Sequence, residues 1–274
     1  MRRLLIRPGA IGDTVLSLPA LECLRADYTE AWVRGDVVPL IRFADNVRSI
    51  ASTSLDLLGL EGVERPQALI NRLESFDSII SWYGSNREEF RAEARKLGLP
   101  IQFLSALPPL DERVHAADYF LAQVGCNGPA VPRIDCPPAP PGDFAVIHPF
   151  SSSSRKNWPI EQFRDLAQRI GMPVRWCAGP EENLEGAVRM ANLYELAAWL
   201  GSARIYIGND SGITHLAAAA GAPVVAIFGP TDPAMWGPRG DRVRVVAGKL
   251  DEIRVEQVLD AVRSAGPSAY PPQR

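Results

Sequence analysis

Short apolar runs alternate with helical patterns along almost the whole chain, and this alternation constrains the fold more than any other feature. The runs are apolar at most positions rather than at every second position, which is typical of parallel strands covered on both faces. A strand, a helix and a parallel strand in succession form a right-handed βαβ unit, so the sequence predicts an α/β protein with open parallel sheets. Strands are predicted at residues 3–7, 78–82, 101–104, 144–148, 174–178, 204–207 and 224–228.

Helical patterns fill the intervals between these runs. Pro19 lies inside the first pattern, which predicts a kink or a late start of that helix. The C-terminal segment 266–274, "GPSAYPPQR", is expected to be flexible or to wrap the surface. Helices are predicted at residues 14–25, 88–96, 160–170, 193–200, 213–220 and 255–264.

The segment "PRIDCPPAPPGDF", residues 132–144, contains five prolines and a glycine and cannot form a helix or a central strand. It is interpreted as a linker, the alternative being a long loop inside one domain. The linker divides the chain into Rossmann-like domains at residues 1–135 and 136–274, with their parallel sheets facing each other across a cleft. Ligands in such sheets bind beyond the carboxyl ends of the strands, so the loops there are the places to search.

Composition narrows the classes of partner and compartment. The 274 residues carry a net charge of −3, which gives no global electrostatic case for binding nucleic acid. The four cysteines include no C-x-x-C pair and are expected to be reduced thiols in a cytoplasmic protein. No secretory or membrane-spanning segment is recognised, although contact with a membrane surface stays open. The three histidines lack ligand spacing, so no metal is expected.

The first candidate loop is "IRPGAIGDTVLSLPAL", residues 6–21, which follows the first predicted strand. Gly9 and Gly12 permit a tight turn and close approach of a ligand, but they form neither a full dinucleotide fingerprint nor a phosphate-binding loop with lysine. Asp13 follows at the predicted helix start. Its carboxylate suits two roles, capping of its own helix or general base catalysis, and the local pattern leaves both open.

Two loops of the second half have the composition of anion sites. "HPFSSSSRKNWP", residues 148–159, offers hydroxyl and cationic donors after a strand. "NDSGITHLAAAAGAPVVAIFGPTDP", residues 209–233, places cap-type residues before an alanine-rich helix whose N-terminus suits an anion. His215 lies one turn into that helix, where a histidine is more often a packed residue than a catalytic one. These loops predict a diphosphate-linked donor in one domain and a base for the acceptor in the other.

The three quoted stretches resemble the glycosyltransferase family 9 heptosyltransferases of bacterial lipopolysaccharide synthesis, and they do so in order across both halves. N-D-S-G-x-x-H followed by F-G-P-T-D-P is the most specific part. The resemblance implies a GT-B fold, ADP-heptose as the typical donor, a lipid-linked or glycan acceptor, inversion at the anomeric carbon and no metal. A cytoplasmic enzyme is expected, and peripheral contact with the cytoplasmic face of the inner membrane stays open.

The resemblance further implies roles for individual residues. Asp13 matches the family's base, within an acceptor-side loop that contains Gly9 and Gly12. His215 matches the motif histidine, expected behind the ligand-contacting residues, and Glu181 stands near the ribose region. The residues expected to bind the donor diphosphate are Lys156, Ser151, Ser152, Asp210, Ser211 and Gly212.

Two other functions remain as alternatives. One is a different nucleotide-sugar enzyme built on Rossmann units, such as an epimerase or an oxidoreductase. Such an enzyme would need a fuller glycine fingerprint and usually a Y-x-x-x-K pair, which the sequence lacks. The other is a non-catalytic GT-B protein that binds a nucleotide-sugar. Detection of released nucleoside diphosphate separates the second alternative from an enzyme.

Overall fold

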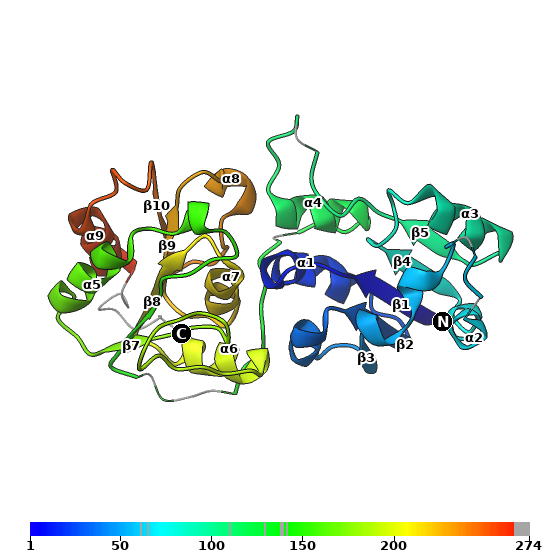
Figure 1. The fold of residues 1–274 in the computed structure, drawn as a ribbon, viewed down its shortest axis with the longest axis horizontal. Coiled ribbons are helices and arrows are strands. Elements are labelled where there is room, and N and C mark those ends of the chain that lie inside the picture. The colour runs from blue at the N-terminus through cyan, green and yellow to red at the C-terminus, as the bar shows by residue number, and fades with distance from the viewer. Residues whose placement is uncertain are drawn as a thin grey trace.

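The computed structural model describes residues 1–265 except residues 61, 65, 110, 129, 138, 139 and 141. Two lobes lie side by side in Figure 1, each built on a five-stranded sheet. The tail predicted to be flexible, and three residues of the linker, lie outside the described residues. None of the helices in the described part combines the length and apolar character that crossing a bilayer requires.

The N-terminal lobe contains a sheet with strand order β3-β2-β1-β4-β5, in which neighbouring strands are parallel. The order reverses between β1 and β4, the position at which open α/β sheets bind ligands. The strands are β1 (Arg2–Arg7), β2 (Tyr28–Val33), β3 (Asn46–Ser49), β4 (Ser78–Ser81) and β5 (Ile101–Phe103). The α-helices of this lobe are α1 (Ile11–Cys23), α2 (Gln67–Glu74), α3 (Glu88–Lys96) and α4 (Ala116–Gln123).

The C-terminal lobe contains a second parallel sheet with strand order β10-β9-β8-β6-β7. Here the order reverses between β6 and β8, and the second and third candidate loops follow these two strands. The strands are β6 (Ala145–His148), β7 (Val174–Trp176), β8 (Ile205–Asn209), β9 (Val224–Phe228) and β10 (Val243–Ala247). The helices are α5 (Ile160–Arg169), α6 (Leu193–Gly201), α7 (Gly212–Ala219), α8 (Pro233–Trp236) and α9 (Val255–Ala265).

The α/β class with parallel sheets is confirmed, but the element boundaries and number differ from the sequence prediction. Helix α1 begins at Ile11, earlier than predicted, and continues through Pro19. The pattern did not predict β2, β3, β10, α2, α4 or α8. Strand β2 was missed because Glu30 stands in its centre. That carboxylate is buried, and it is compensated by ion pairs with Arg48 and Arg72 and by hydrogen bonds from Trp32 and other neighbours.

The two lobes meet where the first turns of α1 and α7 cross (Figure 1). A Cβ atom on Gly212 would stand 2.7 Å from Ile11 Cβ, and one on Gly12 would stand 3.2 Å from His215 Cδ2. Only glycine therefore fits this crossing without displacement. The largest apolar cluster is continuous through it, because it includes buried side chains of both helices, such as Val15 and Leu216.

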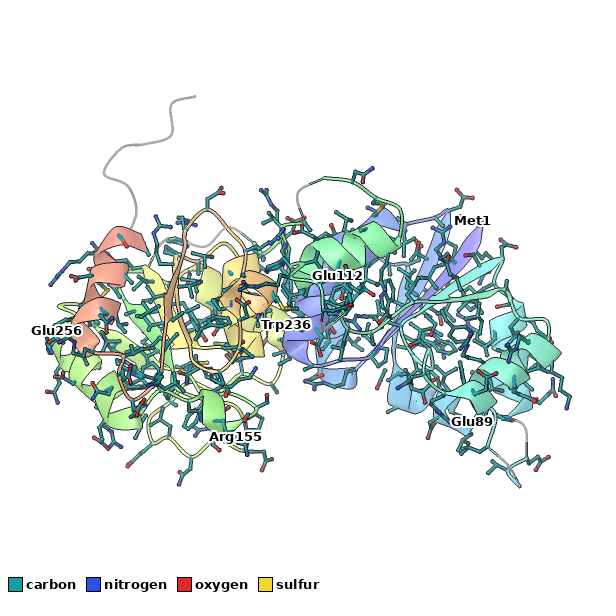
Figure 2. All side chains as sticks on the ribbon, turned by 90° about the horizontal axis from the view of Figure 1, so that it is seen from above. Met1, Glu89, Glu112, Arg155, Trp236 and Glu256 are labelled. Atoms are coloured by element: carbon teal, nitrogen blue, oxygen red, sulfur yellow. A yellow bond between two sulfur atoms is a disulfide. The ribbon has the colours of Figure 1, made fainter. Side chains whose placement is uncertain are left out.

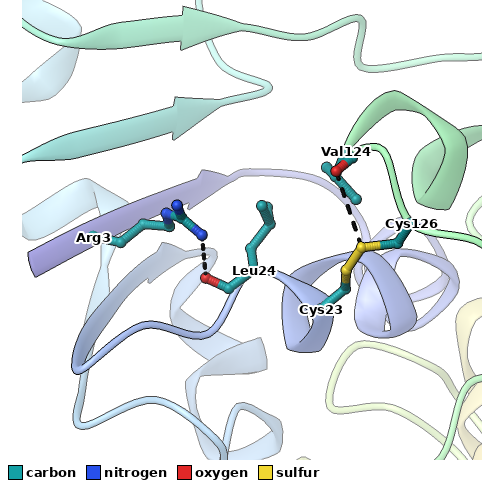
Figure 3. Close-up of a disulfide and its surroundings, with 5 residues drawn as sticks. All are labelled: Arg3, Cys23, Leu24, Val124 and Cys126. Atoms are coloured by element: carbon teal, nitrogen blue, oxygen red, sulfur yellow. Dashed lines mark hydrogen bonds between the residues drawn. A yellow bond between two sulfur atoms is a disulfide. The ribbon is translucent and has the colours of Figure 1, made fainter. Parts of the chain in front are cut away.

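The expectation that all four cysteines are reduced thiols is wrong for one pair. A disulfide joins Cys23, at the end of α1, to Cys126, after α4, with their Cα atoms 6.7 Å apart (Figure 3). Their separation of 103 positions hides this proximity in the sequence. It arises because α1 and α4 pack side by side. Cys136 and Cys177 remain free.

Candidate functional site

Two adjoining cavities lie at the crossing of α1 and α7. The first, here called the α1–α7 cavity, has a volume of about 290 Å³. The second, called the Glu182 cavity, has a volume of about 340 Å³. Both are lined by Ala10, Ser152, Ser211 and Gly212, so a single extended ligand can occupy both.

Asp13 lines the α1–α7 cavity from the first turn of α1. Ala10 is the N-cap of this helix, so Asp13 is the third helical residue and not the cap itself. Its Oδ2 accepts a hydrogen bond from the backbone N–H of Ala10 at 3.0 Å. The Cβ of a larger residue at Gly9 would stand 3.0 Å from Asp13 Cβ. The carboxylate thus supports its own helix and also faces the cavity, so the two roles left open by the sequence coexist.

Arg7 lies beneath Asp13 and was not singled out from the sequence. Its side chain is buried at the end of β1, donates to Ser17 Oγ at 2.8 Å, and stands over the Phe120 ring at 4.5 Å. Burial lowers the pKa of Arg7 to about 10, while the Asp13 carboxylate acts in the opposite direction. The guanidinium is therefore still charged at neutral pH and anchors the turn that carries Asp13. A basic residue at the end of an apolar strand was the available signal.

Lys156 and Asp210 form an ion pair in the same cavity. Lys156 Nζ donates to Asp210 Oδ2 at 2.7 Å, and Thr231 Oγ1 donates to the same oxygen. The backbone N–H of Asp210 is already bonded to Ile227 O, so it is not free for an anion. The Asp210 carboxylate therefore binds Lys156 and fixes the ammonium at the edge of the cavity.

The N-terminus of α7 supplies uncharged donors between the two cavities. Ser211 is the N-cap and accepts from Thr214 N. Among the described residues, no acceptor is found for the backbone N–H groups of Gly212 and Ile213. These N–H groups, at the positive end of the helix dipole, are suited to an anion that spans the cavities.

The serine loop contributes less than its composition suggests. The Ser151 hydroxyl contacts Ser153 O at 2.7 Å and Asn157 Oδ1 at 2.8 Å, so it holds the loop. Ser152 lines both cavities and is the better placed of the two predicted serines.

His215 is buried yet reaches the α1–α7 cavity. Burial lowers the pKa of His215 to about 4, against the opposing effect of Asp210. The imidazole is therefore neutral at physiological pH. It packs against Gly12 and can exchange hydrogen bonds with a ligand without adding charge.

Glu182, the residue that follows the predicted Glu181, lines one of the two cavities. Glu181 is exposed and lines neither cavity, whereas Glu182 lines the cavity named after it. Glu182 Oε2 accepts from Gly179 N at 2.6 Å and lies 3.1 Å from His148 Nε2. Burial tends to raise the pKa of Glu182, but these hydrogen bonds outweigh it and hold the pKa below its usual value. The remaining oxygen of an ionised carboxylate can accept hydrogen bonds from hydroxyl groups of a ligand.

The rest of the Glu182 cavity is largely apolar, with Met190, Leu193 and Leu196 among its walls. Apolar walls with one fixed carboxylate are suited to a flat ring system joined to a polyol. Within the described part of the chain, no group of three or more His, Cys, Asp or Glu side chains is placed to hold a metal ion.

Residues 132–260 match the family described as glycosyltransferase family 9 (heptosyltransferase). The matched segment makes up 129 of the 274 residues, so it is the C-terminal half of the chain that is similar to this family. The chain is 32% identical over 147 residues to lipopolysaccharide heptosyltransferase 1 of Escherichia coli strain K12, an alignment covering 46% of each protein. It is 36% identical over 123 residues to lipooligosaccharide heptosyltransferase 2 of Haemophilus influenzae, covering 36% of the chain and 35% of the relative. These alignments span less than half the length of either curated relative.

Solved structures extend the likeness to both lobes. The E. coli heptosyltransferase WaaC with ADP superimposes with a TM-score of 0.70 at 18% identity, covering 97% of this chain and 100% of that one. A family 9 glycosyl transferase from Veillonella parvula superimposes with a TM-score of 0.74 at 20% identity, covering 96% of each chain. The fold is therefore GT-B.

Proposed function

We propose that this chain is an inverting, metal-independent glycosyltransferase that moves a heptose from ADP-heptose to a lipopolysaccharide-core acceptor. The observation that carries the proposal is the junction of the two cavities at the N-terminus of α7, with Asp13 and Lys156 in one cavity and Glu182 in the other. This arrangement provides separate places for a nucleoside, a diphosphate and a reacting sugar. The family match of residues 132–260 and the relatives named as heptosyltransferases support the choice of heptose.

The charged and polar groups of the two cavities determine how the donor is oriented in this proposal. The nucleoside occupies the Glu182 cavity, where the carboxylate accepts from the ribose hydroxyls. The diphosphate lies across the α7 N-terminus, against the N–H groups of Gly212 and Ile213, with Ser152 and Lys156 beside it. As the bond to the sugar breaks, the leaving ADP gains negative charge, and these donors are already oriented to stabilise it.

Asp13 acts as the general base. Its carboxylate takes the proton of the acceptor hydroxyl as the hydroxyl oxygen attacks the anomeric carbon, and the carbon–phosphate oxygen bond breaks on the opposite face. The proton goes to Asp13 and the bonding electron pair leaves with ADP. The lipid-linked acceptor would be met at the cytoplasmic surface of the inner membrane, through peripheral contact.

Asp13→Asn is the decisive test. The asparagine Oδ1 can still accept from Ala10 N–H, so the helix start is retained, but it cannot take a proton. The variant should fold and bind ADP normally and lose roughly 10²–10⁴-fold in the rate of ADP release from ADP-heptose with acceptor present. Asp251→Asn, at an exposed loop position, is the matched control and should turn over like the native protein. Native turnover in Asp13→Asn would remove the base from the mechanism.

A further inference from the structure

One aromatic wall of the α1–α7 cavity has no part in the donor site. Trp236, the last residue of α8, lines this cavity together with Asp13 and Leu16, but it does not line the Glu182 cavity. It lies between the two lobes in Figure 2. Although it belongs to the C-terminal lobe, it packs against an apolar cluster of the N-terminal lobe that includes Leu16 and Phe120.

Three contacts from the N-terminal lobe hold the segment around Trp236. One contact lies before the tryptophan: Arg113 forms a 2.8 Å ion pair with Asp232. The two remaining contacts lie after it. His115 Nε2 is 2.9 Å from the carbonyl oxygen of Gly237, and Asp118 forms an ion pair with Arg239. We call these three contacts the α8 clasp.

The α8 clasp therefore places polar contacts between the lobes on both sides of the segment that presents the Trp236 indole to the cavity. The indole is only partly buried, and its N–H donates to none of the described residues. A ring of this kind offers an apolar face for the C–H groups of a sugar and one donor for a hydroxyl. Its place beside Asp13, on the wall formed with α1, is where an acceptor hydroxyl must approach the base.

We propose that Trp236 is the platform on which the acceptor sugar stacks, and that the α8 clasp positions it. This inference rests on the proposed transfer reaction. It assigns acceptor recognition to a residue of the C-terminal lobe that reaches across the cleft. The acceptor site is therefore complete only when the two lobes are clasped.

The test compares Trp236→Phe with Trp236→Leu. Leucine keeps apolar packing against the cluster of the N-terminal lobe but lacks an aromatic face, whereas phenylalanine keeps both. Transfer is measured with ADP-heptose and a deacylated, heptose-free lipopolysaccharide core, and ADP affinity is measured by calorimetry. Trp236→Leu should raise the acceptor KM roughly 3- to 10-fold over Trp236→Phe, the worth of one aromatic contact. ADP affinity should be the same in both variants and the native protein.

Asp118→Ala tests the clasp independently, because Asp118 lines neither cavity and its loss removes the ion pair of Arg239, which keeps a 3.4 Å hydrogen bond to Ala130 O. This variant should also raise the acceptor KM while ADP affinity stays unchanged. Equal acceptor KM values for Trp236→Leu and Trp236→Phe would overturn the stacking role, because packing alone would then explain the residue. A native protein that releases no ADP would overturn the transfer reaction itself, and the platform with it. ADP release by the native protein therefore distinguishes failure of the stacking proposal from failure of the transfer reaction.

Discussion

The Lys156 ammonium is held in one position before any ligand binds, and this should strengthen its contact with a phosphate. A flexible ammonium loses conformational freedom when it binds a phosphate, but here Asp210 already holds Nζ at 2.7 Å. Lys156→Ala should therefore weaken ADP binding by about 1.5–3 kcal/mol, the range of a charge-assisted hydrogen bond. Calorimetry with ADP measures the loss. Lys249→Ala, at an exposed lysine paired with Glu252, is the control and should leave ADP affinity unchanged. Unaltered affinity in Lys156→Ala would exclude it from the donor site.

The Glu182 side chain should also make the free energy of unfolding depend on pH. Its pKa in the folded protein lies below the ordinary 4.5, so it contributes stability above about pH 4.5 and loses that contribution as the pH falls through the folded-state pKa. The free energy of unfolding of the native protein should therefore fall more steeply between pH 5 and about pH 3 than that of Glu182→Gln. Urea denaturation at each pH provides the comparison. Parallel curves for the two proteins would contradict the hydrogen-bonded state of this carboxylate.

At the scale of elements, the crossing of α1 and α7 is the tightest constraint. An alanine in a helix is normally more favourable than a glycine, yet the methyl group of Gly212→Ala would meet Ile11 Cβ at 2.7 Å and Gly12 N at 3.0 Å. The helices must separate, so the variant should lose about 1–3 kcal/mol of stability, as overpacked sites do. Turnover should fall with it, because Asp13 moves away from Lys156.

Gly248→Ala is the control for this crossing. Its methyl group would meet only Ile253 Cγ1, at an ordinary 3.6 Å, so its melting temperature and turnover should match the native values. A Gly212→Ala variant as stable and active as Gly248→Ala would show that the crossing is loose.

The elements that the sequence predicted and those that it missed differ in a physical way. Strands such as β6 and β9 are apolar because both faces are covered, and local pattern suffices to find them. Strand β2 contains Glu30, whose burial is offset by Arg48 and Arg72 from outside the strand, and no local pattern reports such distant partners. The same limit applies within the site. Motif spacing placed Asp13 and Lys156, which line one cavity, but it selected Glu181 where the turn presents Glu182. Trp236 reaches its place through packing between lobes, which a single sequence does not show.

At the scale of the molecule, the disulfide joins the C-terminal end of α1 to the segment after α4. Because the bond closes a chain separation of 103 residues, its removal should lower the free energy of unfolding by about 2–4 kcal/mol. Denaturation of the Cys23→Ser and Cys126→Ser variants, or of the native protein with reductant, measures this. Cys136→Ser, at a free cysteine, should be close to native. Neither bonded cysteine lines a cavity, so ADP affinity should persist. Identical denaturation midpoints with and without reductant would contradict the bond.

The glycine crossing also sets a rule for building hybrid enzymes. Exchanging the N-terminal lobe with that of a related glycosyltransferase would replace the Asp13 side of the α1–α7 cavity. However, the first turn of α1 fits the surface of α7 as closely as two parts of one core. In a hybrid joined at the predicted linker, the residues of the foreign lobe that replace Ile11 and Gly12 must pack against Gly212 of this chain. The seam of a working hybrid must therefore include both helix starts, even though they are about two hundred residues apart in the sequence.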